Sequence, residues 1–268
     1  MTKQCPVGVF DSGVGGLTVV QQISQQIPEG RIIYFGDTAH VPYGARSSEE
    51  LICFADKICQ FLLDQGAEVI VDACNSTSAV ALDFLKEKYT IPIIGVIEPG
   101  LEAAISQTRN GRIGVIATEA TIKSDAHKDK AKKRKADVLI VGQACPLFVP
   151  LVESGKVTSQ EAYVAAKKYL EPLQKADIDT LVLGCTHYPF LAPVLQEILG
   201  PDVTVVDPAV ETVRQLKLVV DSIEKHDTIS FHEYFVSGDA EVFQQVGEKL
   251  IGHQKLPKVK QVSLNWGD

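Results

Sequence analysis

The chain has 268 residues, of which 45% are hydrophobic and 22% are charged, so it is long enough for one large core or two domains of ordinary size. A net charge of −8 argues against general nucleic-acid binding, because a phosphate backbone attracts a basic surface. No apolar run approaches the roughly 18 residues of a membrane helix, and the first residues lack the long apolar segment of a signal peptide. We therefore expect no nucleic-acid partner and no membrane partner.

Apolar runs rich in β-branched residues alternate with helical stretches, a pattern that predicts a parallel α/β fold. The first four runs are "VGVFDS" from Val7, "IIYFGD" from Ile32, "VIVDACNST" from Val69 and "GVIEP" from Gly95. The next four are "IGVIAT" from Ile113, "VLIVGQ" from Val138, "TLVLGCTHY" from Thr180 and "TVVDP" from Thr204. After Asp207 we expect a helix, the strand "SFHEYFVSG", a second helix and a polar tail.

The two sets of runs match in order, which indicates an internal repeat. The matched landmarks lie 106 to 111 positions apart: Gly8 with Gly114, Gly36 with Gly142, Cys74 with Cys185, and Pro99 with Pro208. Chance is the alternative, since every α/β protein has apolar strands with a glycine nearby. We favour duplication because both cysteines occupy the same strand end.

The repeat predicts two pseudosymmetric parallel-sheet α/β domains that face each other across a cleft, each with about four strands. The first domain is expected to comprise residues 1–98 and 208–268, and the second residues 99–207. Proline-containing junctions mark both proposed crossings. Ligands of open α/β sheets bind beyond the carboxyl ends of the strands, so we expect the active site between the domains.

The six cysteines are scattered through the chain, and no two of them form a Cys-x-x-Cys pair. A chain of this size does not depend on disulfides, so we expect reduced thiols and a cytoplasmic location. The spacing does not favour a structural zinc site, and we expect no metal. The basic cluster at residues 123–137 is short and has no interleaved aromatic residues, so we interpret it as the solvated face of a helix and not as an anion site.

Cys74 and Cys185 each end an apolar run and are followed directly by hydroxyl or amide side chains. A buried core cysteine is the alternative interpretation, and it fits Cys53, Cys59 and Cys145. One reactive thiol would indicate a covalent nucleophile, whereas two equivalent thiols on opposite walls indicate proton removal from one face of a stereocentre and delivery to the other. Backbone N–H groups at a helix start would lower the pKa of such a thiol.

Three further features lie near these strand ends. Asp11 could orient a substrate ammonium, accept a proton or cap a helix. The glycines of "DSGVGG" would form a turn and supply N–H donors near an anionic substrate group. His187 could tune the thiol of Cys185, although a lone histidine is often structural. The residues alone leave Glu153 and His40 undecided.

The stretches "DSGVGGLTV", "YFGDTAHVPYG", "ACNSTSA" and "LGCTHYP" together resemble the glutamate racemases of the cofactor-independent aspartate/glutamate racemase superfamily. The motifs lie in the family's order from Asp11 to Pro189. The resemblance implies a two-domain pseudosymmetric fold and a homodimer. It also implies a two-base interconversion of L- and D-glutamate without a cofactor, which supplies D-glutamate for peptidoglycan.

The same resemblance implies roles for individual residues. Cys74 would deprotonate D-glutamate with help from Asp11, and Cys185 would deprotonate L-glutamate with help from His187 and Glu153. Contacts with the substrate are implied for Asp11, Ser12, Tyr43, Gly44, Asn75, Ser76, Thr118, Thr121, Thr186 and His187.

Two positions depart from the family's pattern. Ser76 stands where threonine is common and keeps the hydroxyl, and His127 stands where tyrosine is frequent, which leaves the local packing open. Three other functions remain as alternatives: a racemase for aspartate or another amino acid, an inactive amino-acid-binding regulator, and a thiol hydrolase.

Overall fold

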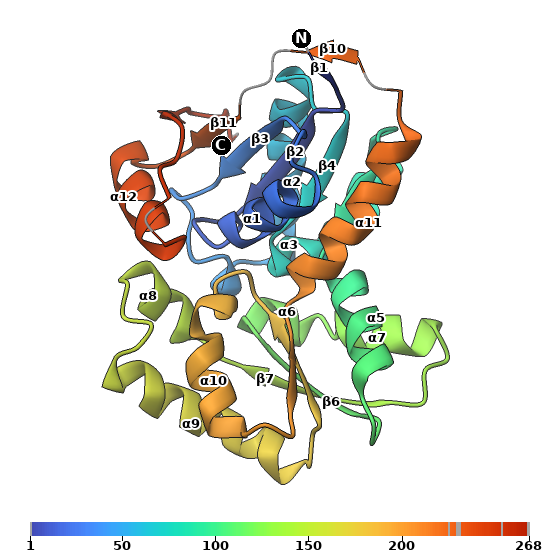
Figure 1. Ribbon diagram of the computed structural model, residues 1–268, viewed down its shortest axis with the longest axis vertical. Helices are drawn as coiled ribbons and strands as arrows, with labels where there is room; N and C mark the ends of the chain where they lie inside the picture. Colours follow the sequence, from blue (N-terminus) through green and yellow to red (C-terminus); the bar gives the residue numbers. More distant parts are fainter. Residues whose placement is uncertain (1, 225, 229–231, 253, 267–268) are drawn as a thin grey trace.

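The computed structural model describes residues 2–224, 226–228, 232–252 and 254–266. Two parallel sheets, each covered by helices on both faces, form an upper and a lower domain (Figure 1). This confirms the predicted fold class of two parallel-sheet α/β domains. Residues beyond the carboxyl ends of strands in both sheets line one shared pocket, so the fold places the site between the domains.

The first sheet has six parallel strands in the order β12–β11–β3–β2–β4–β5. Every residue of β2 and β3 is buried, as expected for apolar strands with helices on both faces. Helices α1 and α11 cover one face, and α2 and α4 cover the other. The strands are β2 (Val7–Asp11), β3 (Ile32–Gly36), β4 (Val69–Asp72), β5 (Ile93–Gly95), β11 (Glu233–Val236) and β12 (Val259–Gln261). The helices are α1 (Leu17–Gln26), α2 (Ser48–Asp64), α3 (Asn75–Val80), α4 (Leu82–Lys88), α11 (Pro208–Ser222) and α12 (Ala240–Leu250).

The second sheet has four parallel strands in the order β7–β6–β8–β9. This order matches β3–β2–β4–β5, so the first three pairs of runs occupy equivalent strands. In the fourth pair "TVVDP" contains β9, but "GVIEP" overlaps β5 only at Gly95, and its residues from Ile97 onward begin α5. Helices α8, α9 and α10 cover one face, and α5 and α7 cover the other. The strands are β6 (Arg112–Ala117), β7 (Leu139–Ala144), β8 (Thr180–Gly184) and β9 (Thr204–Val206). The helices are α5 (Ile97–Gln107), α6 (Glu119–Lys123), α7 (Ala126–Lys133), α8 (Phe148–Glu153), α9 (Gln160–Lys175) and α10 (Ala192–Leu199).

The number of strands in the first sheet differs from the expected four because the C-terminal stretch adds two. Strand β11 confirms part of the predicted strand at 230–238, of which residues 230 and 231 lie outside the described ranges. Strand β12 forms within the stretch interpreted as a polar tail. A separate pair, β1 (Thr2–Gln4) with β10 (His226–Thr228), is antiparallel and was not predicted. Segments of three residues are too short to show a β-strand periodicity in the sequence.

The chain passes from the first sheet to the second after β5 and returns to the first after β9, and a helix follows each of these strands. Helix α5 follows β5, α11 follows β9, and the two helices pack side by side (Figure 1). A Cβ atom on Gly100 would lie 2.8 Å from the Cβ of Pro208, so glycine at this position allows the close approach. The predicted domain boundaries after residues 98 and 207 fall at the starts of these helices and stay a prediction.

Candidate active site

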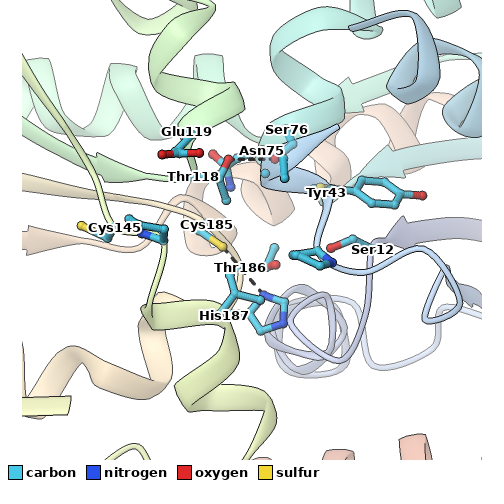
Figure 2. A pocket seen from close by; sticks show the side chains of 16 residues that line it. Ser12, Tyr43, Asn75, Ser76, Thr118, Glu119, Cys145, Cys185, Thr186 and His187 are labelled. Carbon is cyan, nitrogen blue, oxygen red and sulfur yellow. Dashed lines mark hydrogen bonds between the residues drawn. The ribbon is translucent and has the colours of Figure 1, made fainter. Parts of the chain in front are cut away.

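A pocket lies where the carboxyl ends of the two sheets meet (Figure 2). Strands β4 and β8 lead into Cys74 and Cys185, and both residues line the pocket. The predicted site residues that line it are Ser12, Tyr43, Gly44, Cys74, Asn75, Ser76, Thr118, Cys185, Thr186 and His187. The other three, Asp11, Thr121 and Glu153, lie behind this layer, and each hydrogen-bonds to a lining residue.

Asp11 is a buried carboxylate at the end of β2 with three hydrogen-bond donors. Its Oδ2 accepts the N–H groups of Gly13 and Gly16, both at 3.0 Å. Its Oδ1 accepts the hydroxyl of Thr186 at 3.0 Å. Burial raises the pKa of Asp11, while the charge of His187 and the three hydrogen bonds oppose this rise. Asp11 thus ties the glycine-rich turn of the first domain to the second domain.

The glycine-rich turn serves a different purpose from the one predicted. The N–H groups of Gly13 and Gly16 donate to Asp11, so the expectation that they face an anionic substrate group is wrong for these two. At Gly15 the need for glycine is steric, because a Cβ atom there would lie 2.5 Å from Nδ1 of His187. The turn therefore allows the two domains to approach closely at the site.

Cys74 follows β4 and occupies the N-cap position of α3, with its side chain almost fully buried. Burial raises the pKa of its thiol, and the negative charges of Asp11 and Asp72 raise it further. The backbone N–H of Thr77 at the helix start lowers this pKa, as predicted, but burial and the two carboxylates outweigh it, so the expected net lowering is wrong. In this environment Cys74 is a neutral thiol, the form that can give up a proton.

Cys185 lies beside an imidazole that is held by a carboxylate. The Sγ atom of Cys185 is 3.7 Å from Nδ1 of His187, and Nε2 of His187 is 2.6 Å from Oε1 of Glu153 (Figure 2 shows the first contact). Burial lowers the pKa of His187, but hydrogen bonds to Cys185 and Glu153 outweigh it and raise this pKa well above its ordinary value. A protonated His187 can donate to both neighbours, which places positive charge beside the sulfur.

Hydroxyl and amide groups line the opposite part of the pocket (Figure 2). Ser76 Oγ and Thr118 Oγ1 are 3.0 Å apart, and Thr118 Oγ1 is 3.1 Å from Thr121 Oγ1. Thr118 also caps α6 by accepting the N–H of Thr121. The Oδ1 atom of Asn75 is buried and has no hydrogen-bond partner among the described residues, so it can accept a hydrogen bond from a ligand.

Tyr43 lines the pocket, but its hydroxyl is already engaged elsewhere. The hydroxyl donates to Oδ2 of Asp37 at 2.5 Å, and in Figure 2 it points away from Cys185. His40, which the sequence left undecided, pairs through Nδ1 with Oδ1 of Asp37 at 2.8 Å and stacks on Phe54. His40 therefore supports the wall that contains Tyr43 and does not line the pocket.

Six residues that line the pocket were not predicted: Pro42, Ala45, Glu119, Cys145, Pro146 and Val149. Cys145 was assigned to the core, and it is buried, yet it also lines the pocket. It follows β7 directly, just as Cys185 follows β8, so the strand-end rule could have identified it. Glu119 directly follows Thr118, which was predicted.

The described ranges show neither a metal-binding cluster nor a membrane-spanning helix. They hold no group of three or more His, Cys, Asp or Glu side chains arranged to bind a metal ion. Nor does any helix in them have both the length and the apolar character needed to cross a membrane.

The sequence matches a known family over most of its length. The family model described as Asp/Glu/Hydantoin racemase matches residues 16–216. The chain belongs to this family. A glutamate racemase from Desulforudis audaxviator is 47% identical over 263 residues, which cover 94% of this chain and 95% of that protein. The chain is therefore an isomerase of the amino-acid racemase type.

Solved structures agree with this assignment. The crystal structure of glutamate racemase isoform RacE1 from Bacillus anthracis has a TM-score of 0.92 and 38% identity, covering 98% of this chain and 99% of that one. The enzyme from Francisella tularensis, in complex with D-glutamate, has a TM-score of 0.89 and 35% identity, covering 97% of this chain and 98% of that one. An aspartate racemase from Picrophilus torridus, 16% identical with a TM-score of 0.58, shares the fold.

Proposed function

We propose that this family member interconverts L- and D-glutamate by a two-base proton transfer between Cys74 and Cys185. The observation that carries the proposal is the placement of the two thiols. They follow equivalent strands, β4 and β8, of two sheets with the same strand order, and both line one pocket. A stereocentre held in this pocket would have a thiol from each domain available to it.

The reaction needs one thiolate and one thiol at a time. The thiolate takes the α-proton of the substrate, and the electron pair of the C–H bond stays on the α-carbon. The opposite thiol then gives its proton to the other face of that carbon, so the charge has moved from one sulfur to the other and the centre is inverted. We assign Cys74 to the removal of the proton from D-glutamate and Cys185 to its removal from L-glutamate.

The surroundings of the two thiols support complementary starting states. Cys74 is held neutral by burial and by the charge of Asp11, which suits a proton donor. Cys185 has His187 at 3.7 Å, and a protonated imidazole favours negative charge on the sulfur. This distribution is the one needed to start from L-glutamate. Both bases belong to the chain, so we propose that no cofactor takes part.

Substrate recognition would rely on neutral donors and acceptors. The lining residues include the hydroxyl groups of Ser12, Ser76, Thr118 and Thr186 and the amide of Asn75. Hydroxyl and backbone N–H donors can bind both carboxylates of glutamate in a site shielded from water. The buried Oδ1 of Asn75 would accept a hydrogen bond from the substrate ammonium.

Glutamate is favoured over aspartate by the comparisons. Relatives at 40–47% identity are named glutamate racemases, whereas the aspartate racemase named above shares only 16% identity. We further propose that the enzyme is cytoplasmic and that it supplies D-glutamate for peptidoglycan. We also propose that it acts as a homodimer. Light scattering on purified protein tests the dimer.

A panel of amino-acid enantiomers tests the proposed substrate. The protein should convert either enantiomer of glutamate into an equal mixture, detected by chiral chromatography, and should convert aspartate at least about 100-fold more slowly. Faster turnover of aspartate would reassign the substrate. Ligand-induced thermal stabilisation without turnover would favour an amino-acid-binding regulator.

A further inference from the structure

Asp72 is a buried carboxyl group directly behind the Cys74 turn, and it has no assigned role in the proposed reaction. It ends β4 two residues before Cys74 and is completely buried. Its Oδ1 atom lies 2.6 Å from the hydroxyl oxygen of Thr77. Its Oδ2 atom is inaccessible to solvent and has no hydrogen-bond partner among the described residues. Asp72 does not line the pocket, so any influence on the chemistry must pass through its neighbours.

No cation among the described residues contacts either carboxylate oxygen of Asp72. The titratable groups that interact with it are Asp11 at the end of β2, Cys74 at the start of α3 and Cys59 on α2. An isolated buried carboxylate is unfavourable, and such a group keeps its proton instead. Burial raises the pKa of Asp72 to about 8, and the charge of Asp11 also raises it, while hydrogen bonds with the hydroxyls of Thr77 and Ser78 and with the backbone of Cys74 lower it.

The contacts of Thr77 fit a protonated Asp72. The Thr77 hydroxyl oxygen is 2.6 Å from Oδ1 of Asp72 and 3.1 Å from the carbonyl oxygen of Cys74. A hydroxyl has one hydrogen, so it can donate fully to only one of these acceptors. When Asp72 is ionised, the Thr77 hydroxyl donates to its Oδ1; when Asp72 is protonated, it can donate to Thr77 and leave the Thr77 hydrogen for the Cys74 carbonyl. This chain of hydrogen bonds fixes the end of β4 to the turn that holds Cys74.

We propose that Asp72 is a positioning residue for Cys74, which holds the thiol-bearing turn through Thr77 and controls by its charge how readily negative charge develops there. The proposal rests on the two-cysteine racemisation proposed above. A neutral Asp72 adds no charge behind Cys74. An ionised Asp72 adds a second negative charge to that of Asp11, which disfavours both a Cys74 thiolate and a carbanion between the two thiols. Racemisation therefore slows as Asp72 loses its proton.

The pH dependence of kcat/KM between pH 6 and 10 tests this role. Two enantiomers have equal free energy in water, so the profile is the same in both directions. The wild-type profile should start to fall near pH 8, where Asp72 ionises. In Asp72→Asn this fall should move up by about one pH unit, which makes the variant up to about tenfold faster than the wild type in the alkaline range. The matched control is Asp83→Asn on α4, whose side chain is 74% exposed and whose profile should match the wild type.

A second pair of variants leaves Asp72 in place and tests the connection through Thr77. Thr77→Val removes a hydrogen bond that lowers the pKa of Asp72, so its alkaline fall should also move to higher pH. Thr77→Ser keeps the hydroxyl and should retain the wild-type profile. If Asp72→Asn and Thr77→Val lower kcat at every pH without moving the fall, Asp72 has only a structural role and the proposal is overturned.

Alkylation separates this proposal from the proposed function. If wild-type protein racemises neither enantiomer, the glutamate racemase assignment fails, but the influence of Asp72 on the thiol can still be measured. Iodoacetamide reacts with thiolates, so the rate at which Cys74 is labelled reports its ionisation. Asp72→Asn should raise this rate above pH 8 relative to the wild type, with Cys185 labelling as the internal control. Equal labelling of Cys74 in both proteins overturns the proposal.

Discussion

The hydroxyl of Thr186 donates a hydrogen bond of 3.0 Å to Oδ1 of Asp11, a residue 175 positions earlier in the chain. Thr186 follows β8 of the second sheet and Asp11 ends β2 of the first, so this bond joins the two walls of the pocket. Ser76 and Thr118 form a second bond between the walls, also at 3.0 Å. The shape of the pocket therefore depends on how closely the two domains approach.

The first prediction concerns Gly15, which lies against the side chain of Thr186. In Gly15→Ala the new Cβ atom would lie 2.3 Å from Oγ1 of Thr186 and 2.5 Å from Nδ1 of His187, so these buried groups must move from their places in the site. We expect kcat/KM for glutamate to fall about 100-fold, because a displacement near 1 Å at a reacting centre has effects of that size. In the control, Gly142→Ala, the nearest atom is the flexible end of Ile122 at 3.1 Å. Gly15→Ala activity close to that of the control would argue against a tightly closed site.

The second prediction tests the thiols themselves. Cys74→Ser and Cys185→Ser should each lower kcat roughly 1,000-fold, since a serine hydroxyl is a far weaker acid and base at neutral pH. Cys53→Ser is the matched control, because Cys53 is an exposed cysteine on α2. Racemisation rates of the three purified variants check this. Full activity in either pocket variant would exclude the two-cysteine mechanism.

Both thiols were located from the sequence by one rule, that ligands bind where parallel strands end. The rule succeeded at Cys74 and Cys185 because the apolar runs and the repeat define the strand ends well. It could not give the pKa direction of Cys74, which depends on burial of the thiol and then on Asp11, far away in the sequence. Glu153 was undecided for the same reason, since the packing of α8 brings it to His187, 34 positions later in the chain.

The third prediction concerns the pair formed by Glu153 and His187. The pKa of His187 is higher in the folded protein than in the unfolded chain, where it is about 6.5. The ion pair therefore contributes its full stabilisation below pH 6.5, and this contribution is lost as the pH rises through the pKa of the folded protein. Glu153→Gln should lower the free energy of unfolding by about 2 kcal/mol at pH 6 and by less at pH 9.5. Urea denaturation at both values measures this. A loss that does not change with pH would show that the charge of His187 is not involved.

The fourth prediction concerns His127, which is buried and whose Nε2 has no hydrogen-bond partner among the described residues. Burial lowers its pKa to about 4, while the unfolded chain binds the proton near pH 6.5. Stability should therefore fall as pH decreases between these values, by about 3 kcal/mol in total. His127→Phe should remove this dependence. Urea denaturation of both proteins at pH 7 and 4.5 tests it, and an equal loss of stability in both would assign the acid sensitivity to other groups.

The C-terminal stretch shows a second limit of sequence interpretation. Strand β12 has three residues, and its pairing with β11 is fixed by the sheet it joins and not by its own periodicity. The first three matched runs in each half, by contrast, form strands of four to six residues, and helices cover both faces of their sheets. These longer strands were therefore the more predictable part of the fold, and the three-residue strands were the less predictable part.

Exchange of the α-proton in deuterated water tests the two-base mechanism most directly. We expect each enantiomer of glutamate to gain deuterium at the α-carbon as it is converted, and the newly formed enantiomer to be fully labelled from its first appearance, because the second thiol delivers a solvent-derived proton. Mass spectrometry after chiral separation measures this. Product that keeps the original hydrogen would mean that a single group removes and returns the same proton, and it would contradict the assignment of Cys74 and Cys185 as two separate bases.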